Sequence, residues 1–241
     1  MPYDPIQAYK NGCVLFRGDH ETATHCPKCK ASRYVEVEGS DGNKKQSKIP
    51  EMVIRHLPIV PRLQRQYMTE ESAKQMTWHK NDKRYSDKMQ HPADGDAWKH
   101  FDAMNPGKAE EARNVRVALA TDGFNPFGMM VAPYTCWPVF VIPLNLPPGV
   151  MFEPKNVFLT LIIPGHPGNN MGVFMEPVWD ELHKAWEEGV LTYDRATKTN
   201  FTMHVWYQYS MHDFLAYGLF SAWCVHGKFP CPTCKADVMF T

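Results

Sequence analysis

The sequence predicts an α/β fold built on a mixed sheet. Three β-prone runs separated by Gly, Pro and Asn lie between residues 115 and 163. A segment with helical spacing of apolar residues, 176–190, follows them and ends at Gly189, as a helix C-terminus should. Another β-prone run, FTMHVWYQYS, then occupies 201–210. Strands, a crossover helix and a further strand in this order favour a sheet with both parallel and antiparallel pairs.

Composition places few limits on function. The 241 residues are 44% hydrophobic, enough for one large domain or one domain with small appendages. The 26 basic and 26 acidic residues balance, so the overall charge gives no argument for a polyanionic partner. The sequence has no N-terminal apolar segment and no apolar run of about 18 residues, so we expect neither a signal peptide nor a membrane span.

The chain divides into four predicted regions. A small cysteine-containing module and a linker occupy 1–50, and a basic helical segment occupies 51–110. The α/β core is expected at 111–223, and a Cys/His segment begins at 224 and runs to 241. In the helical segment, PRLQRQYMTEESAKQMTWH and HPADGDAWKHFDAM have the proline, acid and apolar spacing of helix starts.

Positive charge is concentrated in residues 44–88. This stretch holds 11 Lys and Arg residues against 5 Asp and Glu residues, an excess of 11 − 5 = 6. Such a patch can neutralise phosphates of a nucleic acid, and a solvated basic face is the alternative. The candidates for contact with a DNA backbone are Arg62, Arg65, Lys83 and Arg84.

Two of the β-prone runs end on an acid. Asp122 ends RNVRVALATD, and Asp213 follows FTMHVWYQYS closely. In a ribonuclease-H-like core, the first strand and the strand after the crossover helix lie side by side and parallel. Neighbouring strands are about 4.8 Å apart, so the two carboxylates could share a Mg²⁺ ion, which prefers oxygen ligands. Alternatively, the Asp122–Gly123 pair is only a turn.

Seven cysteines include two C-x-x-C pairs, which in a chain without a secretory signal indicate metal or redox chemistry in a reducing, intracellular compartment. The sulfur and nitrogen ligands expected for a C-terminal zinc site are Cys224, His226, Cys231 and Cys234. Cys26 and Cys29, next to His25, form a second candidate that needs at least one more ligand. Reduced surface thiols or a redox pair are the alternatives. Cys13 and Cys136 are expected to be ordinary packing residues.

Ordered motifs give the chain a specific resemblance. RNVRVALATDGFNPFG, LIIPGHPGNN, DFLAYGLFSAW and GKFPCPTC follow one another as in the plant CACTA (En/Spm-type) transposon transposases, and CPKCKASRY and HPADGDAWKHFD fit upstream. The similarity covers roughly residues 13–236. It implies a ribonuclease-H-like core of the DDE type, Mg²⁺ or Mn²⁺ as cofactor, transposon-end DNA as partner, and a nuclear protein that can form homo-oligomers.

The resemblance also assigns roles residue by residue. Asp122 resembles the first catalytic acid of that family and Asp213 the second, while Cys231 and Cys234 resemble its C-x-x-C pair. The family's third acid lies further along than Thr241, so we expect a truncated or transposon-derived copy. The predicted function is therefore cut-and-paste DNA transposition. The alternative is a non-catalytic DNA- or protein-binding remnant of a transposase.

Overall fold

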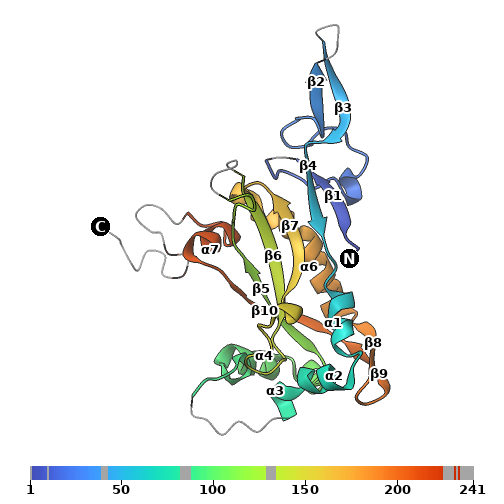
Figure 1. The fold of residues 1–241 in the computed structure, drawn as a ribbon, viewed down its shortest axis with the longest axis vertical. Helices are drawn as coiled ribbons and strands as arrows, with labels where there is room; N and C mark the ends of the chain where they lie inside the picture. Colours follow the sequence, from blue (N-terminus) through green and yellow to red (C-terminus); the bar gives the residue numbers. More distant parts are fainter. Residues whose placement is uncertain are drawn as a thin grey trace, which may run out of the picture.

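The fold is described from a computed structural model (Figure 1). The residues that the structure describes are 2–9, 11–38, 43–81, 88–128, 134–224, 231 and 233. Within them, a six-stranded sheet forms the centre, and two separate two-stranded hairpins accompany it. This arrangement confirms the predicted mixed α/β class. No helix in the described ranges has the length and apolar composition to span a bilayer.

The central sheet has the strand order β1-β4-β7-β6-β5-β10. Its strands are β1 (Asp4–Ala8), β4 (Met52–His56), β5 (Val115–Thr121), β6 (Cys136–Pro143), β7 (Phe158–Pro164) and β10 (Val205–Met211). β10 pairs with β5 in parallel, and the other neighbours are antiparallel. The three predicted strands of the core thus form a meander. β10, which follows the crossover helix after one further hairpin, lies beside the first of them in parallel, as in the predicted ribonuclease-H-like order.

The crossover helix α6 (Met171–Glu187) packs against the sheet. Of the described helices, it has the longest stripe of buried side chains. It begins five residues before the predicted start at 176, because Met171, Phe174 and Met175 are all buried against the core. Most of the stability of a helix in a protein comes from such packing. Pro177 lies inside the helix.

The predicted strand at 201–210 is divided between two strands, β9 (Thr199–Met203) and β10. β9 forms a hairpin with β8 (Val190–Asp194), and β10 begins only after His204. The backbone N–H of His204 donates to the side chain of Asn114 at 2.8 Å, and Val115 N–H donates to His204 C=O at 2.8 Å. These bonds end one strand and align the next with β5.

The segment 51–110 combines one strand with short helices. β4 joins the central sheet, and it is followed by α1 (Val60–Gln66), α2 (Glu70–Met76), α3 (Trp78–Asn81), α4 (Asp96–Met104) and α5 (Pro106–Ala109). The predicted helical segment therefore consists of several short helices preceded by a strand. Thr69 separates α1 from α2, because its hydroxyl accepts a hydrogen bond from Ser72 N–H at 3.2 Å and caps the second helix.

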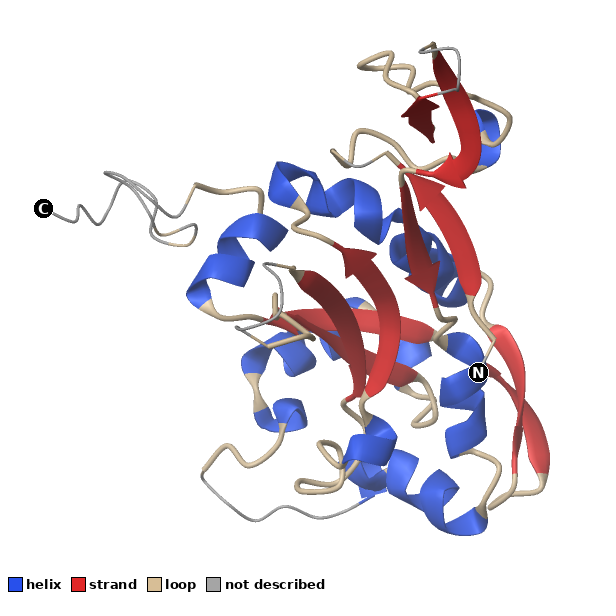
Figure 2. Cartoon of the chain, turned by 45° about the horizontal axis from the view of Figure 1, so that its top comes forward, coloured by secondary structure: helices blue, strands red, loops and turns tan. Residues whose placement is uncertain are grey.

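The N-terminal residues contribute both to the sheet and to a small module beyond it. β1 pairs with β4, whereas β2 (Tyr34–Glu38) and β3 (Lys44–Pro50) form a hairpin that stands apart from the central sheet (Figure 2). β3 includes 44–48, part of the stretch 38–48 that the sequence predicts as a loop or linker. The module has its own small core of Tyr9, Val14, Phe16 and Cys26.

Candidate functional site

Asp122 and Asp213 occupy matching positions at the ends of neighbouring strands. In the parallel ladder, Met211 of β10 pairs with Ala120 of β5. Asp213 and Asp122 each lie two residues beyond that pair, so both carboxylates leave the sheet at the same level. Adjacent strands are about 4.8 Å apart. A parallel pair of strands thus brings together two acids that are 213 − 122 = 91 residues apart in the sequence.

The two acids line one pocket. Its volume is about 580 Å³, and its walls come from the ends of β5, β6 and β10. Most of its lining is apolar, and both carboxylates belong to exposed residues at its mouth. The lining residues are Ala120, Thr121, Asp122, Phe124, Pro138, Phe140, Met211, His212 and Asp213.

Hydrogen bonds fix one oxygen of each carboxylate. Asp122 Oδ1 accepts from Gly123 N–H at 2.7 Å. Asp213 Oδ1 accepts from Ala216 N–H at 2.6 Å and caps α7 (Phe214–Phe220). Among the described residues, the second oxygen of each carboxylate has no hydrogen-bond partner. A pair of exposed carboxylates with free oxygens is a donor set that suits a hydrated Mg²⁺ ion.

His212 links the two strand ends. Its Nδ1 lies 3.3 Å from the carbonyl oxygen of Thr121, the residue before Asp122. Because a carbonyl only accepts, Nδ1 carries the proton in this contact. Burial lowers the pKa of His212, which favours the neutral imidazole. The ring stacks on Phe220 of α7 with 4.5 Å between centroids, so it also joins the strand ends to that helix.

Gly123 sets the direction in which the chain leaves Asp122. A Cβ atom at this position would lie 2.5 Å from Cε2 of the Trp137 indole, which is 5% exposed. We expect Gly123→Ala to cost roughly 1–3 kcal/mol, as overpacking at a buried ring does. It should also weaken divalent-ion binding, because the chain next to Asp122 must shift. Chemical denaturation and Mn²⁺ titration measure the two effects. Gly107→Ala, with no atom within 4 Å of the added carbon, is the matched control.

Of the predicted DNA contacts, the two that the structure describes, Arg62 and Arg65, lie away from this pocket. Arg62 is 7% exposed, and its Nη1 donates to the carbonyl of Leu159. Burial lowers the pKa of Arg62. Arg65 is exposed, and both arginines line a second cavity of about 600 Å³ that shares no residue with the carboxylate pocket. Lys83 and Arg84 lie outside the described residues.

The structure groups three cysteines near the N-terminus. The sulfurs of Cys13, Cys26 and Cys29 lie within 4.8 Å of one another and could hold a metal ion such as zinc. Cys13 was expected to be only a packing residue, and that expectation was incomplete. His25 is exposed, lies outside the group, and has its Nδ1 3.0 Å from the Thr24 hydroxyl.

The C-terminal zinc prediction remains a prediction. Cys224 is exposed and Cys231 is half-buried. His226 and Cys234 lie outside the described residues. Cys136 lies at the start of β6, where burial raises the pKa of its thiol, as suits a packing residue.

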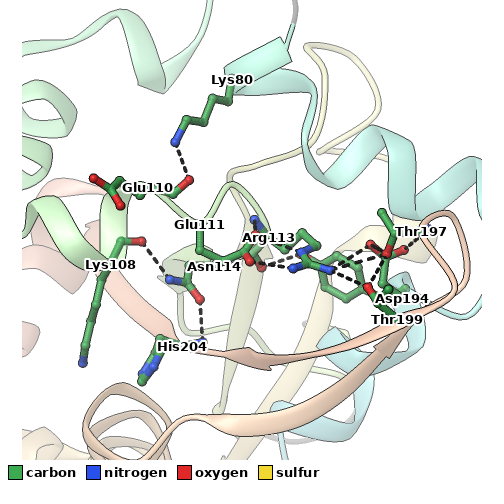
Figure 3. A network of polar contacts seen from close by, with 11 residues as sticks. Lys80, Lys108, Glu110, Glu111, Arg113, Asn114, Asp194, Thr197, Thr199 and His204 are labelled. Carbon is green, nitrogen blue, oxygen red and sulfur yellow. Dashed lines mark hydrogen bonds and ion pairs between the residues drawn. The ribbon is translucent and has the colours of Figure 1, made fainter.

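A polar network at the other end of β5 was not found from the sequence (Figure 3). Arg113 donates to Glu111 at 2.6 Å and 2.8 Å and to Asp194 at 3.4 Å. Asn114 accepts from His204 N–H and donates to the Lys108 carbonyl, each at 2.8 Å. The network attaches the β8–β9 hairpin and the chain before β5 to the central sheet. Its members are scattered over more than 80 residues, so no local pattern marks them.

Comparison with protein families identifies the chain. Residues 86–241 match the model of the transposase family tnp2. The chain belongs to this family. The match includes both acids at the strand ends and excludes the three N-terminal cysteines. No curated protein and no solved structure matches the sequence significantly. The tnp2 assignment confirms the predicted transposase relationship and implies that DNA is the partner.

Proposed function

We propose that this tnp2 chain carries the nuclease core of a cut-and-paste DNA transposase of the CACTA (En/Spm) type. Asp122 and Asp213 are its first and second metal-binding acids, and Mg²⁺ or Mn²⁺ is the cofactor. The supporting observation is the equal offset of both acids from the Met211–Ala120 pair. Membership of a transposase family supports the reaction class. Transposon-end DNA, a nuclear location and homo-oligomers belong to the same proposal.

The donor set fits the ion. Two carboxylates on rigid strand ends, each with one free oxygen, supply the one or two ligands that Mg²⁺ takes from a protein. Bound there, the ion would polarise a phosphodiester and make water or a hydroxyl more acidic. Asp122 and Asp213 hold and orient it. The Gly123 and Ala216 N–H groups keep each carboxylate in place, which preorganises the site.

Nicking of supercoiled plasmid DNA tests the proposal. We expect a version of the protein that includes the family's third acid to convert the plasmid to open circles in Mg²⁺ or Mn²⁺, with no conversion in EDTA. The loss of the paramagnetic resonance signal of free Mn²⁺ measures ion binding at the carboxylates, in protein whose thiol sites have first been filled with an equivalent amount of Zn²⁺ and whose unbound Zn²⁺ has been removed. Thiolates retain Zn²⁺, whereas Mn²⁺ prefers oxygen ligands.

The two measurements separate the proposal from its alternative. Binding of Mn²⁺ without any nicking would identify a non-catalytic remnant that retains the site. Absence of both Mn²⁺ binding and nicking would contradict the assignment of Asp122 and Asp213.

A further inference from the structure

The three-cysteine cluster of Cys13, Cys26 and Cys29 is assembled by two adjoining turns. In the first turn, Tyr9 N–H donates to Val14 C=O at 3.2 Å, and Gly12 N–H donates to Tyr9 C=O at 2.8 Å. Gly12 has φ +65°, which a glycine adopts readily. The turn presents the Cys13 sulfur toward the second turn, which carries the Cys-Pro-Lys-Cys sequence.

The second turn is folded around a sulfur. Cys26 N–H donates to Ala31 C=O at 2.8 Å, and Lys30 N–H donates to Cys26 C=O at 2.9 Å. Within this loop the N–H of Cys29 points at Cys26 Sγ, 3.5 Å away. Lys30 adopts the left-handed conformation, with φ +63°. A turn that directs a backbone N–H at a sulfur stabilises that sulfur as a hydrogen-bond acceptor. A thiolate is a good acceptor, whereas a thiol is only a weak one.

The cluster is partly removed from water. Cys26 is fully buried, Cys13 is half-buried, and Cys29 is exposed. In the described part of the module, the core has four buried hydrophobic residues, one of which is Cys26 itself. So small a core rarely stabilises a module by itself, and a structural metal is a common remedy.

Tyr9 lies beside the sulfurs. The residue is 7% exposed, and burial raises the pKa of its hydroxyl; repulsion from Cys29 and a hydrogen bond that the hydroxyl donates to Cys29 raise this pKa further. The hydroxyl therefore stays protonated at neutral pH and is a hydrogen-bond donor. Among the described residues, no fourth His, Cys, Asp or Glu joins the group.

We propose that Cys13, Cys26 and Cys29 bind one Zn²⁺ ion as three thiolates, with water in the fourth position. Each thiol gives its proton to solvent when it binds. Zn²⁺ is four-coordinate in structural sites and takes thiolate sulfur readily. Three thiolates and Zn²⁺ carry a net charge of 2 − 3 = −1, and the exposed Lys28 and Lys30 of the second turn supply positive charge beside it. This site is separate from the carboxylate pair and does not depend on the proposed nuclease function.

The zinc site also anchors the module to the core. The first turn touches α6, because Asn170 Nδ2 donates to Asn11 C=O at 2.8 Å and Gly12 packs against the Phe174 ring. Arg17 forms an ion pair with Asp180 of α6 at 2.5 Å. Loss of the ion should loosen these turns and leave the central sheet folded.

Metal analysis of a chain with its other zinc candidates removed tests the proposal. The background variant has Cys224, Cys231 and Cys234 replaced by Ser and has Asp122 and Asp213 replaced by Asn, so that bound metal reports on the N-terminal cluster alone. We expect about one zinc per chain and, after exchange for Co²⁺, the visible absorption and sulfur-to-metal charge-transfer intensity of a three-thiolate tetrahedral site. These readings need no substitution in the cluster and so do not depend on a variant that could misfold.

Substitutions then identify the ligands. In the same background, Cys13→Ser should weaken zinc binding at least about tenfold, since even residues that only orient metal ligands change affinity by about 10–100-fold. Cys136→Ser is the matched control and should bind zinc normally. Chelation should accelerate hydrogen exchange at the amides of Gly12, Cys26 and Lys30 and leave β5 amides unchanged. The proposal is overturned by a chain without zinc, by a Cys26–Cys29 disulfide that forms in the presence of zinc, or by equal zinc affinity of Cys13→Ser and Cys136→Ser.

Discussion

Asp122→Asn is expected to abolish divalent-ion binding at the strand ends and to lower Mg²⁺-dependent nicking at least about 100-fold. Metal ions supply several kcal/mol of transition-state stabilisation in such reactions, and each 1.36 kcal/mol is a tenfold change in rate. Asparagine has nearly the same shape and can still accept from Gly123 N–H, so the chain should fold normally. Mn²⁺ titration and the plasmid assay give the two readouts.

Asp213 allows a sharper version of the same experiment. Its side chain caps α7, and Asn is as good a cap as Asp, whereas Ala costs about 1 kcal/mol. Asp213→Asn should therefore lose the ion without losing stability, and Asp213→Ala should lose both. Asp96→Asn is the control, because that carboxylate is fully solvent-exposed on α4. Normal ion binding by Asp122→Asn and Asp213→Asn would remove the basis for the nuclease proposal.

Arg113→Ala is expected to lower the free energy of unfolding by about 3–5 kcal/mol. Asp194 is 2% exposed, and the Arg113 guanidinium is the cation with which it forms an ion pair. Without Arg113, a buried carboxylate keeps only neutral donors, the Ala196 and Thr197 groups. The guanidinium also lies over the Phe201 ring, 4.1 Å from its centroid, and that contact is lost as well. Urea unfolding measures the change.

A double substitution shows how much of this loss is due to the buried charge. In an Asp194→Asn background, Arg113→Ala should cost clearly less, since no charge remains to be desolvated. Lys74→Ala is a matched control, because its ion pair with Glu70 is exposed on both sides and such pairs contribute little. Equal costs of Arg113→Ala in both backgrounds would show that Arg113 acts through its contacts with Glu111 and Phe201 and not through the charge of Asp194.

Local sequence patterns predicted most elements of the core. Alternating and β-branched runs marked β5, β6, β7 and β10, and helical spacing marked α6. The same reading failed at His204, where a continuous β-prone run is divided between a hairpin and the central sheet. The break comes from a hydrogen bond to Asn114, which is 90 residues away. A local pattern contains no information about such a partner.

The candidate site shows the same division. The sequence indicated Asp122, Asp213, Cys26 and Cys29 from strand ends and from C-x-x-C spacing. It missed Cys13, because a single cysteine in a turn has no spacing that distinguishes a ligand from a packing residue. Arg62 carries a charge that predicted exposure, whereas the structure buries it against the carbonyl of Leu159.

The sequence by itself determined the core strands β5, β6, β7 and β10, the helix α6, the acids that follow two of these strands, and the transposase family. Only the tertiary structure decided that β10 lies parallel to β5, so that both acids reach one pocket, and that two turns bring three sulfurs together. The physical reason is that propensity, capping and periodicity act within a few turns of chain. Proximity between distant residues arises from burying apolar faces together and from pairing backbone donors across strands.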